Sequence, residues 1–127
     1  MDLILDTNAL SAVVDGDPAI RPFVQRAASV EISVITLGEY RFGISQSKRR
    51  AECEKWLREY LDLYTILKVA EDTAEHYARL RALLKRAGKP IPANDLWIAA
   101  QGAQFDLAIL SRDEHFDAVP SVRRIAW

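Results

Sequence analysis

Hydrophobic residues form two kinds of pattern that alternate along this chain. A short continuous apolar run at residues 3–5 is typical of a strand buried on both faces, and further strands are predicted at residues 30–35, 65–69, 107–110 and 122–126. Between these strands, apolar residues recur every three or four positions, as on one face of a helix. Helices are therefore predicted at residues 8–14, 20–28, 36–47, 53–64, 71–87 and 94–104.

The alternation of strands and helices predicts the fold class. Strands separated by helices pair in parallel through right-handed crossovers, which place helices on both faces of the sheet. We therefore expect an α/β fold of three layers, with a central parallel sheet flanked by helices. The chain has 127 residues, 50% of them hydrophobic, which suits a single domain spanning residues 1–127.

The composition limits the kinds of partner and the cell compartment expected for the protein. The net charge of -1 gives no indication of a nucleic-acid-binding protein. Any binding to nucleic acid must therefore come from local patches of basic residues. Cys53 is the only cysteine, which excludes an internal disulfide and agrees with a reducing cytoplasm. The opening MDLILDTNAL is not a signal peptide, and no run approaches the roughly 20 apolar residues of a membrane span. We expect a cytoplasmic protein without a membrane partner.

Four acidic residues stand where functional groups are expected in a parallel sheet. Asp6 directly follows the first predicted strand, and Glu39 lies one helical turn beyond the second. Asp113 comes shortly after Leu110, and Asp95 lies at the start of a helix. Ligands bind outside the carboxyl ends of the strands in such sheets. The four carboxylates are therefore predicted to converge on one crevice.

Such a cluster needs a positive occupant. Converging carboxylates repel one another, and each raises the pKa of its neighbours. A hard divalent cation such as Mg²⁺ prefers carboxylate oxygens and retained water. One or two Mg²⁺ or Mn²⁺ ions polarise a phosphoryl oxygen and lower the pKa of bound water, which is the chemistry of phosphodiester hydrolysis.

Each acid also has a purely structural interpretation as a helix cap. The residues that fit this interpretation are Asp6, the Thr36–Glu39 pair as a capping box, Asn94 with Asp95, and Asp113. Caps need not all lie at one edge of a sheet, so the joint pattern favours a site. The polar residues beside the acids support a polar site as well; they are Thr7, Asn8, Thr36, Asn94 and Ser111.

Basic residues crowd the helix and loop that lead to Asp95, and they are Arg79, Arg81, Lys85, Arg86 and Lys89. They form either a solvated helix face or a phosphate track beside the metal site. Arg86, Lys89 and Arg112 are the candidate RNA contacts, although Arg112 could instead pair with Asp113. The two histidines are poorer metal candidates: His76 fits a helix surface or a packing position. His115 is near Asp113 and could touch substrate, but a solvated turn is the favoured interpretation.

Four segments together resemble the PIN-domain ribonucleases, and most of all the VapC toxins of toxin–antitoxin pairs. They are LDTNAL at 5–10, the GEY around Glu39, IPANDLWIAA at 91–100 and ILSRDEHF at 109–116. The resemblance covers essentially the whole chain. It implies that Asp6, Glu39, Asp95 and Asp113 hold the metal. It also implies supporting hydrogen bonds from Thr7 or Asn8 and from Ser111, which stands where the family often has threonine.

The resemblance further implies a metal-dependent endoribonuclease that acts as the toxin of a type II pair. Such proteins are generally homodimers inhibited by a small antitoxin, whose C-terminal segment lies across the active site. A larger toxin–antitoxin assembly is also compatible with this expectation. These partner properties come from the resemblance alone.

Other functions fit the motifs less well. Haloacid-dehalogenase-like phosphatases have Asp-x-Asp after the first strand, whereas Thr7 and Asn8 follow Asp6 here. The chain has neither GxxxxGK[ST] nor GxGxxG, which argues against nucleotide binding. A non-catalytic PIN-like module that binds RNA or protein remains the alternative, but such a module would be expected to have lost at least one of the acids.

Overall fold

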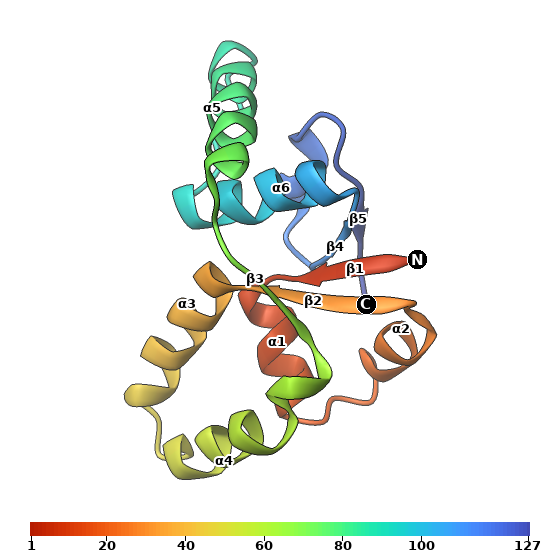
Figure 1. Cartoon of the computed structure of the whole chain (residues 1–127), viewed down its shortest axis with the longest axis vertical. Helices are drawn as coiled ribbons and strands as arrows, with labels where there is room; N and C mark the ends of the chain where they lie inside the picture. Colours follow the sequence, from red (N-terminus) through yellow and green to blue (C-terminus); the bar gives the residue numbers. More distant parts are fainter.

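Five parallel strands form the centre of the molecule, in the order β3-β2-β1-β4-β5 (Figure 1). The computed structural model describes residues 1–127. The strands are β1 (Asp2–Leu5), β2 (Ser29–Ser33), β3 (Thr65–Leu67), β4 (Ala108–Leu110) and β5 (Arg124–Ile125). The predicted parallel sheet is confirmed, although the last strand is shorter than the predicted segment 122–126.

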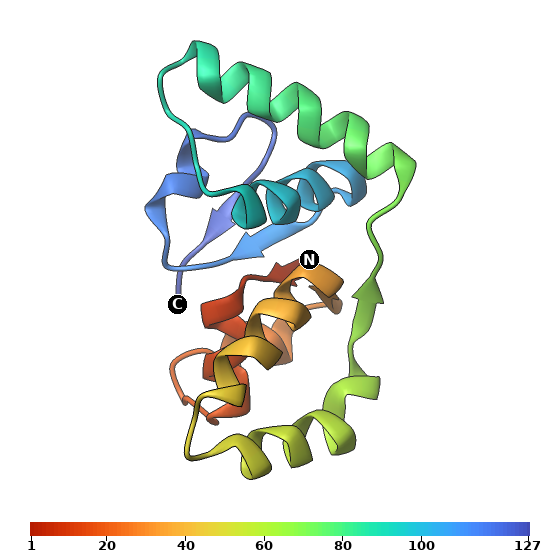
Figure 2. The same cartoon turned by 90° about the vertical axis from the view of Figure 1, so that its left-hand side faces the viewer.

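Helices cover both faces of this sheet. They are α1 (Thr7–Val14), α2 (Arg21–Arg26), α3 (Val34–Ser45), α4 (Arg50–Tyr60), α5 (Glu71–Arg86) and α6 (Ala93–Phe105), with short 3₁₀ helices η1 (Leu61–Leu63) and η2 (Glu114–Ala118). Figures 1 and 2 show α5 and α6 on one side of the strands and α1 to α4 on the other. The expected three-layer α/β fold is therefore confirmed. No helix combines the length and the apolar character that crossing a membrane requires.

The apolar run of β1 is continuous because both of its faces are buried. Leu3 and Leu5 pack into a core with α1, α3 and α4, whereas Ile4 packs into a second core with α5 and α6. Ile4 and Leu5 are both fully buried. A strand whose side chains alternate between two cores needs an apolar residue at every position.

The strand order creates a crevice beside the end of β1. The chain moves from β1 to β2 and β3 on one side, and then returns to β4 and β5 on the other. The connections that follow β1 and β4 therefore diverge, which is the arrangement that opens a ligand-binding crevice in parallel sheets. The last contact before this divergence is the N–H of Asp6, which donates to the Leu110 carbonyl at 3.4 Å.

Two helices are capped differently from what their sequence patterns predict. Ser33 caps α3, since its Oγ accepts the Ile35 N–H at 3.1 Å, and the helix starts at Val34. The predicted capping box of Thr36 and Glu39 is therefore wrong. The predicted Asn94 cap is also wrong, because α6 starts at Ala93 after Pro92, with no side-chain cap.

Helix α6 lies close against β4 because a glycine faces the strand. A Cβ atom added at Gly102 would lie 3.2 Å from the Leu107 carbonyl oxygen and 3.5 Å from Ile109 Cγ1. A larger residue would push α6 away from the sheet. Since Asp95 is on the first turn of α6, this packing also sets the position of its carboxylate.

Candidate metal centre

Asp6 is both a helix cap and a buried acid at the end of β1. Only 2% of the surface of this residue is exposed to solvent. Its Oδ1 accepts the N–H of Ala9 at 2.8 Å, which caps α1. The capping interpretation of Asp6 is thus correct, but it does not exclude a site. A cap at this point holds the carboxylate in a defined orientation at the edge of the sheet.

Ser111 connects two of the predicted acids across neighbouring strands. It is fully buried, and its Oγ accepts the N–H of Asp113 at 2.9 Å. Burial raises the pKa of Asp6 above its usual value, while hydrogen bonds from Ser111 and Ala9 lower it and the charge of Asp113 raises it. Ser111 therefore orients the backbone of one acid and stabilises the ionised form of the other.

Glu39 reaches the site from α3. The hydroxyl of Thr7 donates to Glu39 Oε1 at 3.0 Å, so the first residue of α1 holds the Glu39 carboxylate. The buried Thr36 hydroxyl donates to the Leu5 carbonyl at 3.4 Å, which ties the first turn of α3 to the end of β1. Thr36 thus fastens α3 to the sheet instead of capping the helix.

Asp95, Asp113 and His115 form the tightest group in the site. They can each offer one ligand atom such that all three atoms lie within 4.8 Å of one another. His115 Nε2 lies 3.1 Å from Asp95 Oδ2. The favoured interpretation of His115 as part of a solvated turn is therefore wrong, and its contact with Asp95 was not predicted. The signal was its neighbour Phe116, which is fully buried and anchors η2 beside the acids.

The other three acids act on the protonation of Asp95. Its pKa is raised to about 6, and burial is the largest cause of this rise. The charges of Glu39, Asp113 and Asp6 contribute to the rise, whereas the charge of His115 opposes it. The carboxylates predicted from the sequence are therefore close enough to interact. Their mutual repulsion is only partly offset by the protein's own groups.

The remaining predicted residues surround this group at greater distance or face elsewhere. Asn8 lines a hollow together with Thr7 and Glu39. Asn94 is exposed and lines a separate hollow that also contains Glu39. The structure therefore places both amides near Glu39, on different sides of it.

The structure places the three candidate RNA contacts on two different elements. Arg86 and Lys89 are exposed at the C-terminal end of α5 and in the loop after it. Arg112 Nε donates to the Trp127 carbonyl at 2.8 Å, and its guanidinium lies 4.5 Å from the centre of that indole ring. Arg112 is thus held by the C-terminal residue, and the alternative of a pair with Asp113 is wrong.

Comparison with known proteins decides the family. Residues 3–122 match the PIN domain. This chain belongs to the PIN-domain family. The sequence is 35% identical over 122 residues to ribonuclease VapC5 of Mycobacterium tuberculosis, a match that covers 91% of this chain and 86% of that protein.

Solved structures agree with this assignment. The structure of FitAcB from Neisseria gonorrhoeae superposes with a TM-score of 0.85 at 29% identity, covering 98% of this chain and 97% of that one. VapBC2 from Rickettsia felis, solved bound to a promoter DNA fragment, has a TM-score of 0.87 at 23% identity and covers 100% of this chain and 99% of that one. The second likeness shows the fold alone.

The residues of this PIN domain fit a divalent cation. The donor set consists of carboxylate oxygens and one imidazole nitrogen. Carboxylates suit Mg²⁺ and Mn²⁺, and an imidazole is compatible with Mn²⁺. Burial first, and then the charges of the neighbouring carboxylates, raise the pKa of Asp95, and a bound cation would favour its ionised form.

We expect Asp95→Asn to stabilise the metal-free protein at high pH. The pKa of Asp95 is raised to about 6 in the folded state, so the ionised carboxylate destabilises the fold above that pH. This destabilisation disappears as the pH falls through about 6 towards the unfolded value of about 4. In EDTA, the variant should melt a few degrees higher than wild type at about pH 8, and the two should converge at about pH 4.5. A variant that melts lower at about pH 8 would contradict this account.

Proposed function

We propose that residues 1–127 act as a single PIN-domain nuclease: a metal-dependent endoribonuclease that works in the cytoplasm as the toxin of a type II toxin–antitoxin pair. The observation that carries this proposal is the convergence of Asp6, Glu39, Asp95 and Asp113 at one edge of the sheet. Relatives that cover most of the chain are named ribonuclease VapC or toxin FitB, which supports both the reaction and the role.

The proposed ligands of the cation are Asp6, Asp95 and Asp113, with Glu39 at the edge of the group. We propose one or two Mg²⁺ or Mn²⁺ ions per chain. When bound, such an ion polarises a phosphoryl oxygen and lowers the pKa of its water. The proximity of Asp95 and Asp113, which is independent of any ion, supports this assignment.

The other residues of the site hold the acids in place. Ser111 fixes Asp113 through its N–H, and Thr7 fixes Glu39 through a hydroxyl donor. His115 lies beside Asp95 and shields part of its charge. Asn8 and Asn94 supply amides near Glu39, where they can donate to a phosphate or to a carboxylate.

We expect cleavage to leave a 5′-phosphate and a 3′-hydroxyl. Attack by the ribose 2′-hydroxyl would be promoted by an acid–base pair such as two histidines, and the chain has two histidines, of which only His115 lies at the acids. The measurement is end analysis of fragments from single-stranded RNA incubated with the protein and Mg²⁺ or Mn²⁺.

The control reaction contains EDTA and should yield no fragments. Full activity in EDTA, or 2′,3′-cyclic phosphate ends, would contradict the mechanism. A shift of RNA mobility without fragments in the presence of metal would instead support the alternative of a non-catalytic binding module.

We propose two kinds of protein partner, a second copy of the chain and a small antitoxin. A similar solved structure, VapBC-5 from Mycobacterium tuberculosis, is of a member of the VapBC family of toxin–antitoxin systems. The antitoxin is proposed to carry a basic or polar segment that enters the acidic crevice, since such a segment would offset the repulsion among the carboxylates. Larger toxin–antitoxin assemblies remain compatible with this proposal.

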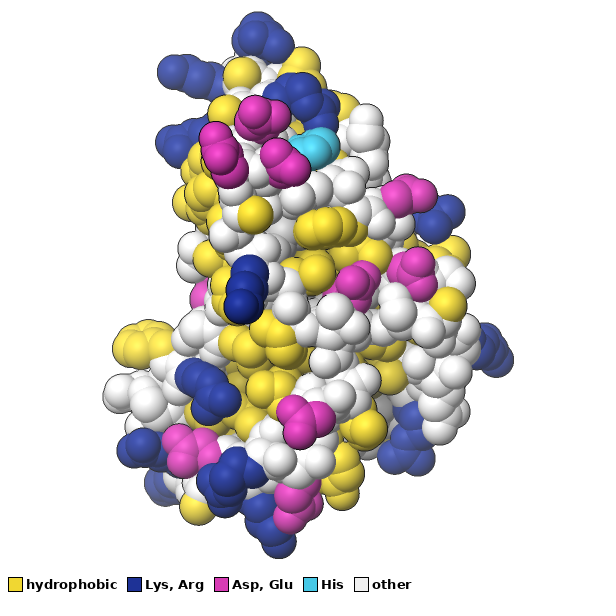
Figure 3. Space-filling model, viewed as in Figure 1, with side chains coloured by type: hydrophobic (Ala, Val, Ile, Leu, Met, Phe, Trp, Pro, Cys, Tyr) yellow, Lys and Arg dark blue, Asp and Glu magenta, His cyan; other side chains and the backbone are white.

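The surface proposed for the homodimer lies on α3 beside Glu39. Phe42 is 72% exposed and Val34 is 38% exposed. Both line one hollow together with Gly38 and Asn94. Figure 3 shows a hydrophobic side chain protruding over α3. An apolar group of this kind beside a functional site is typical of a protein interface.

Phe42→Lys should therefore convert the dimer into a monomer in light scattering at micromolar concentration, because it places a charge in the apolar contact. Leu63→Lys is the matched control, since Leu63 is 78% exposed but lies on η1, away from α3. A wild-type monomer, or equal dissociation by both variants, would contradict the proposed surface.

A further inference from the structure

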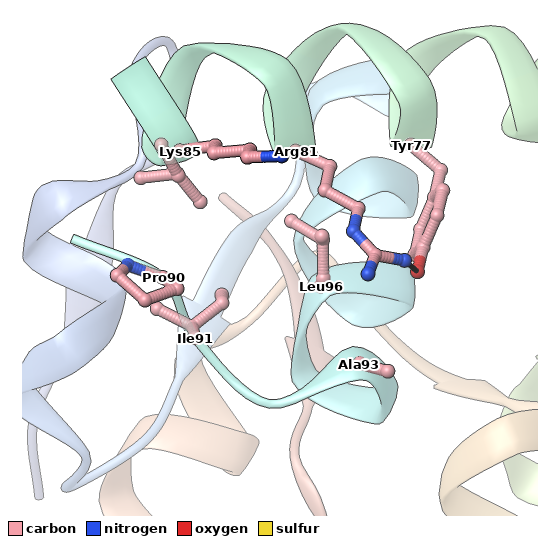
Figure 4. A pocket seen from close by; sticks show the side chains of 8 residues that line it. Tyr77, Arg81, Lys85, Pro90, Ile91, Ala93 and Leu96 are labelled. Carbon is pink, nitrogen blue, oxygen red and sulfur yellow. Dashed lines mark hydrogen bonds between the residues drawn. The ribbon is translucent and has the colours of Figure 1, made fainter. Parts of the chain in front are cut away.

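A pocket of about 400 Å³ lies between the second half of α5 and the segment that leads into α6. Figure 4 shows Tyr77, Arg81 and Lys85 on α5 above the loop with Pro90 and Ile91, with the guanidinium of Arg81 turned towards Tyr77. Leu96 of α6 closes the pocket from the side of the core. None of these residues has a role in the metal centre.

One wall of the pocket is held rigidly. The ring of Tyr77 stacks on Trp97, with 3.9 Å between ring centres and 18° between planes. Arg81 Nη1 donates to the Tyr77 hydroxyl at 2.9 Å, which holds the guanidinium at the same wall. A polar head fixed beside an aromatic face loses little conformational freedom when a ligand binds.

The charge at this end of α5 is positive and has no acidic partner. Arg81 and Lys85 line the pocket, and neither forms an ion pair in the structure. Arg86 and Lys89 are exposed nearby. The acids of α5 lie in its first two turns, at the opposite end of the helix. Figure 3 shows Lys and Arg side chains gathered around the end of α5 that is farthest from the sheet.

The pocket also touches the helix that carries one of the acids. Ala93 and Leu96 line it, and both belong to the first turn of α6, which carries Asp95. The pocket therefore shares one helical turn with Asp95, which itself does not line it. Apolar walls, a fixed aromatic face and unpaired cations are the features with which proteins bind single-stranded nucleic acid, through stacking and phosphate contacts.

We propose that this pocket binds one nucleotide of the single-stranded RNA that is cut at the metal centre. The base packs against Ile91, Pro90 and Leu96, and its phosphate is contacted by Lys85 and Arg81. This inference rests on the proposed ribonuclease function and adds a binding site outside the metal centre. The unpaired cations favour RNA over an apolar protein segment, which would leave Arg81 and Lys85 without an anion.

The test measures RNA binding by fluorescence anisotropy with the full chain in EDTA, where no cleavage occurs. Lys85→Ala and Arg81→Gln should each raise the Kd about fivefold or more and reduce the salt slope by about 0.7, the value for one phosphate on a single strand. Arg79→Gln is the matched control. It removes the same charge from α5, but Arg79 faces away from the pocket and contacts His76. Its effect should be below about twofold.

A second arm tests the base. A series of RNAs is prepared in which a single abasic nucleotide occupies each position in turn. At one position the missing base should weaken binding by the wild-type protein. The same RNA should cause no further loss of affinity with Ile91→Asp, because that variant no longer holds the base. Circular dichroism melts check that each variant is folded. Equal losses for Arg79→Gln and the pocket variants would overturn the inference, because binding would then follow net charge alone. Pocket variants that dissociate a dimer but leave RNA affinity unchanged would also overturn it, in favour of a protein contact.

These outcomes are separate from the failure of the proposed function. Wild-type protein that binds RNA at the pocket but never cleaves it with metal would leave the binding site standing and remove the nuclease. If the wild-type protein cleaves RNA but the pocket variants bind RNA as tightly as wild type, the nuclease function stands and the pocket is not an RNA-binding site.

Discussion

Repulsion among carboxylates that are partly removed from water is the constraint around which this structure is organised. Asp6 is buried at the end of β1. For Asp95, its own burial and the charges of the neighbouring acids raise the pKa to about 6. Such an arrangement lowers the stability of the metal-free fold, so it persists only where something compensates. A divalent cation would offset the repulsion and use the same oxygens for chemistry. Stability and function are then coupled through one group of side chains.

The fold supports this group by rigid, local means. Parallel strands bring the ends of β1 and β4 to one edge, and the order of the strands opens the crevice there. Three hydroxyls then fasten the surrounding elements: Thr36 ties α3 to β1, Thr7 holds Glu39, and Ser111 holds Asp113. These hydroxyl side chains are short and uncharged. They therefore fix the positions of the helices and acids without adding charge to the site.

Much of this architecture could be predicted from the sequence, because burial on both faces requires unbroken apolar runs such as Leu3 to Leu5. The motifs likewise predicted the family, which comparison confirms. The failures arose where residues distant in sequence compete. Ser33 took the cap predicted for Thr36, whose hydroxyl instead reaches the end of β1. The position of His115 depends on the packing of η2 against the core, which spacing alone does not reveal.

The most direct test of the central claim is a thermal melt of Asp6→Asn with increasing Mg²⁺, paired with its RNA cleavage rate. Asparagine keeps the oxygen that accepts the Ala9 N–H, so the cap survives while one negative charge is lost. We predict a Tm in EDTA at or above that of wild type, a smaller gain in Tm with Mg²⁺, and loss of cleavage. Asp6→Ala is the matched control and should lose about 1 kcal/mol with the cap. If Asp6→Asn cleaves RNA and gains stability from Mg²⁺ as wild type does, Asp6 is only a cap and the account is contradicted.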